Sequence, residues 1–156
     1  MIMRDDAWLY ARLDYIWDTY FSDVEQDNIV RIVWGRKAKT RLGSIKLDVN
    51  DPTVTIITIN RLYQDEFVPE YVIDATIVHE LSHYAHGFNS PHAQTKQHPH
   101  AGGVMAREFA ERGLTDMYRA QKRWLKANWA GYVTQHFGSP KKRRRKVVVP
   151  TLKWFT

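Results

Sequence analysis

The sequence predicts one α+β domain followed by a basic C-terminal extension. A chain of 156 residues with 44% hydrophobic and 13% aromatic residues is long enough to enclose the core of one domain. Apolar residues recur at helical spacing in four segments, and three short β-branched runs lie between the first and second of these. We therefore assign a domain to residues 1–137 and an extension to residues 138–156.

The first half of the chain predicts one helix and a small sheet. Residues 6–21 carry an apolar stripe at spacings of three and four, formed by Leu9, Leu13, Ile16, Trp17 and Tyr20. The runs IVRIVW (29–34), SIKLDV (44–49) and TVTIITI (53–59) predict strands, with a turn signal at residues 50–52. The simplest arrangement of these strands is a three-stranded antiparallel sheet.

The second half predicts three more helices. The segment 69–86 begins with Pro69, keeps an apolar stripe and is stopped by Gly87. Residues 88–99 are polar and rich in histidine, which predicts a loop, and helices are expected at 101–112 and 116–137. We expect the SPKKRRRK segment to be solvated, and VVVPTLKWF after it is apolar enough to dock as a strand.

Composition excludes several classes of protein. The chain has no cysteine, which excludes disulfides, iron–sulfur clusters and cysteine nucleophiles and leaves His, Asp and Glu as metal ligands. No apolar run approaches the roughly 18 residues that would predict a membrane span. The start, MIMRDDAWLY, lacks the basic and then apolar pattern of a secretory signal, so we expect a cytoplasmic or nucleoid-associated protein with no membrane partner.

Charge is distributed unevenly along the chain. Residues 1–116 hold 12 Lys or Arg and 17 Asp or Glu, a net charge of −5, whereas residues 117–156 hold 11 cations and no acid. The overall charge of +6 is therefore the sum of an acidic body and a basic end. Such a basic end predicts a polyanionic partner, of which nucleic acid is the commonest.

The segment His79-Glu80-Leu81-Ser82-His83 has the HExxH pattern. On a helix, side chains four residues apart lie on the same face, so both imidazoles can reach one zinc ion at about 2.0–2.1 Å. Glu80 lies beside the first ligand and can take a proton from a water molecule at the ion. Tyr84 and Arg107 are candidates for stabilising an oxyanion, and the sequence selects neither.

A catalytic zinc site normally takes three protein ligands and leaves one position to water. His86 shares a helix face with His83, so it would crowd one side of the ion, and we expect it to lie near the ligands or at the surface. The preferred third ligand is His100, because it opens a predicted helix and a rigid element holds a metal better than a loop. The alternatives that remain are His92, His98, Glu108 and Glu111.

Four segments resemble the SprT-like zinc metallopeptidases, a family that includes the Spartan type of DNA–protein crosslink protease. The segments are WGRKAKTRLGSIKL (34–47), TIITIN (55–60), VIDATIVHELSHYAHG (72–87) and HAGGVMAREFAERGL (100–114). This resemblance implies a zincin-like fold, one Zn²⁺ on His79, His83 and His100, and Glu80 as the general base. It also implies peptide-bond hydrolysis in protein substrates, including proteins bound or crosslinked to DNA.

The chain departs from the family pattern at three points. Ala101 stands where the family usually has glycine, and Val104 stands where it usually has an aromatic residue. The Cys-rich zinc ribbon of many members is absent, because the chain has no cysteine.

The basic end is the candidate replacement for that ribbon. Six consecutive cations are candidate phosphate contacts: Lys141, Lys142, Arg143, Arg144, Arg145 and Lys146. The PKKRRRKV run also resembles a monopartite nuclear import signal, which predicts a nuclear location in a eukaryotic cell. Two alternatives therefore stay open beside the peptidase: a non-proteolytic DNA-binding protein with a structural zinc, and a nuclear-targeted or virion-associated interaction protein. The sequence predicts no oligomeric state.

Overall fold

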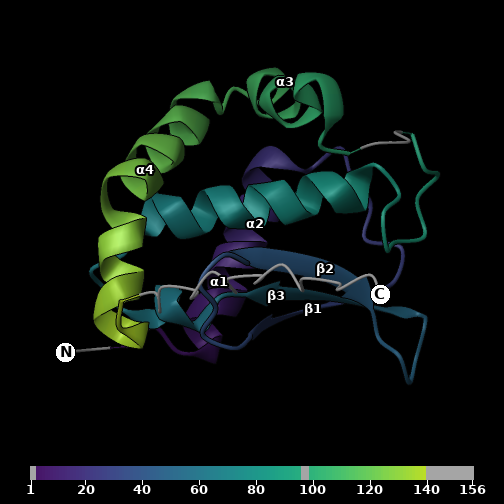
Figure 1. Ribbon diagram of the computed structural model, residues 1–156. Helices are drawn as coiled ribbons and strands as arrows, with labels where there is room; N and C mark the ends of the chain where they lie inside the picture. The colour runs from purple at the N-terminus through teal and green to yellow at the C-terminus, as the bar shows by residue number, and fades with distance from the viewer. Residues whose placement is uncertain (1–2, 96–98, 140–156) are drawn as a thin grey trace, which may run out of the picture.

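The computed structural model describes residues 3–95 and 99–139, and it has the predicted α+β class (Figure 1). The helices are α1 (Asp6–Tyr20), α2 (Glu70–Ala85), α3 (Val104–Glu111) and α4 (Thr115–Phe137), and the strands are β1 (Ile29–Trp34), β2 (Gly43–Leu47) and β3 (Val54–Ile59). Short 3-10 turns at Arg61–Gln64 and Ala101–Gly103 precede α2 and α3. The four helices and three strands lie within two residues of their predicted ends, except that the helix predicted at 101–112 begins with the second of these turns.

The predicted all-antiparallel sheet is wrong. The strand order is β1-β3-β2, in which β2 pairs antiparallel with β3 but β1 pairs parallel with it, from Ile29 opposite Val54 to Trp34 opposite Ile59. The reason is the length of the segment 35–42, which exceeds the roughly two to five residues of a common hairpin. This segment carries the chain across the end of β3, so that β3 enters between β1 and β2.

One buried side chain holds this crossing segment in place. Asn60, which is 3% exposed, donates from Nδ2 to the carbonyls of Ala38 (2.8 Å) and Arg41 (3.0 Å). Its Oδ1 accepts from the backbone N–H groups of Ala38 and Leu62. A buried amide with both ends satisfied is tolerated in a core, and here it fixes the path of the loop that leads into β2.

The second helix is the centre of the domain. Figure 1 shows α2 lying across one face of the sheet, with α3 on the far side of α2. Of the residues of this helix 12 are buried, as is typical of a helix enclosed by its neighbours. Gln121 of α4 donates to the Val72 carbonyl and the Thr76 hydroxyl, which fixes α4 against the first half of α2.

The first helix is fastened to α2 by an ion pair. The Arg12 guanidinium donates to both carboxylate oxygens of Asp74, at 2.9 and 2.6 Å, and lies 2.9 Å from Glu70. Trp124 and Trp129 of α4 are partly buried against the core. Over the described ranges, no helix combines the length and the apolarity that a membrane span requires.

Candidate metal centre

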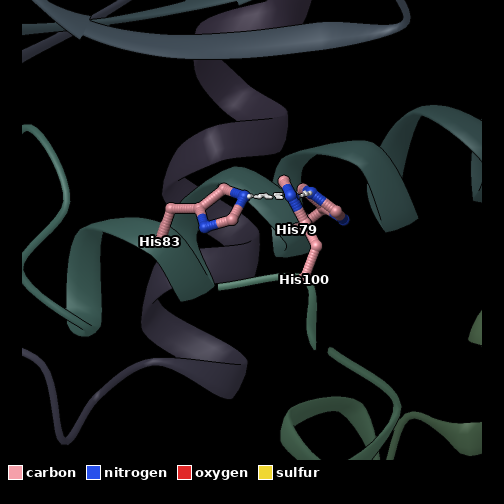
Figure 2. A group of neighbouring side chains, drawn as sticks. All are labelled: His79, His83 and His100. Carbon is pink, nitrogen blue, oxygen red and sulfur yellow. Dashed lines mark hydrogen bonds between the residues drawn. The ribbon is translucent and has the colours of Figure 1, made fainter. Parts of the chain in front are cut away.

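Three histidine side chains converge beside α2 (Figure 2). His79 and His83 project from the same face of α2, one turn apart. His100 directly precedes the 3-10 turn before α3, and its side chain points toward the other two. The Nε2 atoms form a nearly equilateral triangle, with sides of 3.1 Å (His79–His83), 3.1 Å (His79–His100) and 3.0 Å (His83–His100). The structure thus brings together the three predicted ligands.

The donor set fits a divalent metal ion. Three nitrogens bound to one tetrahedral zinc at about 2.0–2.1 Å lie about 3.3 Å apart, close to the separations of this triangle. Burial, together with the neighbouring imidazoles, lowers the pKa of His79 to about 4 and that of His83 to about 3. Both rings are therefore neutral at pH 7, as ligation requires.

Glu80 lies beside the triangle in a buried position. Its side chain is buried (4% exposed), and burial raises its pKa to about 8. A Cβ atom added to Gly43 would lie 3.0 Å from Glu80 Oε1 and 2.8 Å from Thr76 Cγ2. Glycine at position 43 therefore leaves the space that the Glu80 carboxyl occupies.

A cavity of about 300 Å³ opens over the three imidazoles. Its walls come from β2, from α2 and from the segments on either side of the undescribed residues 96–98. The lining residues are Gly43, Ser44, Ile45, His79, Glu80, His83, Phe88, Asn89, Pro99 and His100. Because β2 is an edge strand, this cavity lies along the free side of the sheet.

The other proposed ligands are engaged elsewhere or lie outside the described ranges. His86 Nε2 lies 2.9 Å from the buried Glu108 carboxylate, and His92 Nε2 lies 2.6 Å from the Glu25 carbonyl. Glu111 is exposed on α3 and does not belong to the cluster, and His98 is not among the described residues. The His86–Glu108 pair ties α3 to the end of α2, and so it supports the segment that carries His100.

Neither candidate for the oxyanion lines the cavity. Tyr84 is fully buried and its hydroxyl donates to Asn28 Oδ1 at 2.7 Å, while the Arg107 guanidinium donates to the Gly102 carbonyl. The structure instead reveals a residue that the sequence gave no reason to select. Asn89 has a left-handed backbone (φ 54°), and its side-chain amide donates to the Ile45 carbonyl on the free edge of β2.

Asn89 belongs to a chain of hydrogen bonds that links α2, the sheet and the cavity. The Tyr84 hydroxyl donates to Asn28, Asn28 Nδ2 donates to the Thr55 hydroxyl, and that hydroxyl donates to the Asn89 carbonyl. This chain of hydrogen bonds fixes the position of Asn89 relative to α2.

The six predicted phosphate contacts, Lys141–Lys146, lie outside the described residues.

No protein-family model, curated protein or solved structure matches the chain.

Proposed function

We propose that the chain is a zinc-dependent peptidase of the SprT-like type. The observation that carries this proposal is the convergence of three imidazoles beside a buried carboxyl group, at the base of an open cavity. Hydrolysis of an amide at a metal centre needs an open coordination position, a proton acceptor and a wall that excludes bulk water. His79, His83 and His100 would leave the open position toward the cavity, and Glu80 would be the proton acceptor.

The residues have separate roles in this proposal. The three histidines would hold the zinc ion, which when bound polarises a carbonyl group and lowers the pKa of water. Glu80 would accept a proton from the attacking water and return it to the leaving amine. The positive charge of a bound zinc ion would lower the pKa of Glu80 from its value of about 8, so that the carboxylate form is available at neutral pH.

The donor set favours a catalytic ion over a structural one. A structural zinc is normally enclosed by four protein ligands, whereas within the described residues the cluster holds three, next to an open cavity. Glu80 makes no ion pair with another described residue, and a buried carboxyl group without one costs stability, which is a common price of function. These two features support the peptidase over the DNA-binding protein with a structural zinc.

A protein substrate is the best match to the cavity. Its wall is the free edge of β2, where an extended segment can pair with backbone groups, and the edge is partly covered by Asn89. We propose further that the basic extension, with its six cations at 141–146, holds the enzyme on DNA, so that DNA-bound or DNA-crosslinked proteins are its substrates.

The test compares the wild type with Glu80→Gln, each at equal zinc content. Both proteins are incubated with casein and with a DNA-bound protein, in the presence and absence of single-stranded DNA. The proposal expects cleavage by the wild type alone. It is refuted if no condition gives Glu80-dependent cleavage, and retention of biological activity by Glu80→Gln would favour the structural zinc.

A further inference from the structure

The acidic body of the chain contains a strongly basic segment. Residues 28–47 hold six cations and no acid, although the first 116 residues together have a net charge of −5. Five of these cations belong to the segment that crosses the sheet and to β2, and Arg61 follows β3 nearby: Arg36, Lys37, Lys39, Arg41, Lys46 and Arg61. We call these six residues the basic face.

The cations of the basic face are exposed and unpaired. All six are solvent-exposed, and within residues 3–95 and 99–139 none lies within 4.0 Å of a carboxylate. By contrast, Arg12 and Arg112 both form ion pairs with acidic residues. Uncompensated charges of one sign produce a field that attracts a polyanion.

The segment that presents these charges is held in place. Besides the bonds from Asn60, Trp129 Nε1 of α4 donates to the Lys39 carbonyl at 2.7 Å, and Arg61 Nε donates to the Gly35 carbonyl at 3.1 Å. Three of the cations, Arg36, Arg41 and Lys46, line one hollow of about 460 Å³. Because the hollow is already formed, little conformational entropy is lost from its backbone when a phosphate binds.

The basic face adjoins the metal centre. Its hollow shares Gly43 and Ser44 with the cavity over the histidines. A second hollow of about 260 Å³ is lined by both Arg41 and Glu80, so this arginine stands at the border of the two regions. A ligand on the basic face would therefore lie next to any substrate in the cavity.

An aromatic side chain completes the surface. Phe137, at the end of α4, is 41% exposed, and Lys39 Nζ lies 5.5 Å from the centre of its ring. An exposed ring beside unpaired cations is the combination that binds a single strand, because bases stack on the ring and phosphates meet the charges.

We propose that the basic face binds single-stranded nucleic acid next to the metal centre, independently of the C-terminal extension. The inference adds to the proposed function a surface on the folded domain that would place nucleic acid beside the substrate. It rests on the proposed function for its biological use only, since binding is measured without cleavage.

The test uses full-length protein in which residues Lys141–Lys146 are changed to Gln, so that the extension does not mask the domain. Fluorescence anisotropy follows a labelled oligothymidylate over a series of salt concentrations. The loop variant adds Arg36→Gln, Lys37→Gln, Lys39→Gln and Arg41→Gln. The control variant removes the same charge from exposed positions of α4, by Arg119→Gln, Lys122→Gln, Arg123→Gln and Lys126→Gln.

The loop variant should lose up to about 2.8 from the slope of log affinity against log salt, because each phosphate contact to a single strand contributes about 0.7. The control variant should lose much less, and Arg36→Lys with Arg41→Lys should keep the slope. Phe137→Ala should lower the affinity with little change in slope. Circular dichroism verifies that each variant is folded.

Four results would overturn the inference: no binding once the extension is neutral, equal losses in the loop and control variants, tighter binding of duplex than of single strand, or stronger binding to phosphatidylserine vesicles than to the oligonucleotide. Because none of these readouts depends on Glu80, a failure here is distinct from a failure of the peptidase proposal.

Discussion

Replacing Gly43 by alanine should separate the position of Glu80 from the binding of metal. The added Cβ would lie 3.0 Å from Glu80 Oε1 and 2.8 Å from Thr76 Cγ2, whereas ordinary contact begins at 3.4 Å. The carboxyl oxygen must therefore move by 0.4 Å and the methyl group by 0.6 Å. None of the three histidines is among the nearest neighbours of that Cβ, so zinc content should stay unchanged.

The expected size of the effect follows from these shifts. Overpacking of a tight site costs about 1–3 kcal/mol of stability, which urea unfolding measures. A misplacement of about 1 Å can cost about 100-fold in rate, so a shift of 0.4 Å should lower kcat/KM by about 6-fold. Peptide cleavage at fixed zinc content gives the rate.

Two companion variants isolate the cause. Gly35→Ala crowds Thr58 on the sheet and does not touch Glu80, so it should lower stability and leave kcat/KM unchanged. Adding Thr76→Ser to Gly43→Ala removes the crowded methyl group and keeps the hydroxyl that donates to Val72, so stability should recover while the rate stays low. A Gly43→Ala protein that is folded and cleaves at the wild-type rate would refute the reasoning.

Three further predictions concern stability. Glu108→Ala leaves the buried His86 unpaired and should cost about 1–3 kcal/mol in urea unfolding, whereas the exposed Glu111→Ala should cost under about 0.5 kcal/mol; equal losses would contradict a role for the pair. In metal-free protein, burial lowers the pKa of the two motif histidines to about 4 and about 3 and raises that of Glu80 to about 8. The unfolded chain then binds more protons than the native chain below about pH 6.5 and fewer between about 6.5 and 8, so these groups make stability highest near pH 6.5. Glu80→Gln should abolish the decline above that pH, and a decline that persists would count against the burial of the carboxyl group. Zinc at about 1,000 times its Kd should raise the free energy of unfolding by about 4 kcal/mol, visible as a higher Tm, and no rise would exclude a native-state site.

Local patterns in the sequence were sufficient to predict most of the elements. The stripe of Leu9, Leu13 and Ile16 is buried as expected, and α2 begins directly after Pro69. Strand direction was not predictable in this way, because the pairing of β1 with β3 depends on the path of residues 35–42. That path is fixed by the tertiary bonds of Asn60, which leave no periodic signal in the sequence.

In the candidate site, too, the features that depend on local spacing were predictable and those that depend on tertiary contacts were not. The spacing of His79 and His83 on one helix predicted their common face. His100 was preferred as the third ligand because a helix was expected to begin directly after it, whereas His100 in fact precedes a 3-10 turn and α3 begins at Val104. The contacts that arrange these residues could not be predicted from the sequence. The pairing of His86 with Glu108 joins two helices, and the position of Asn89 depends on a left-handed backbone that non-glycine residues rarely adopt.

The number of imidazole ligands at the metal is the most direct test of the proposed centre. X-ray absorption at the zinc K-edge of the one-to-one complex counts those ligands and measures their distances. We expect three imidazole nitrogens at about 2.0–2.1 Å with one further light atom, and two imidazoles in His100→Ala, while His92→Ala keeps three. Four imidazoles in the wild type, or three retained in His100→Ala, would contradict the proposed centre.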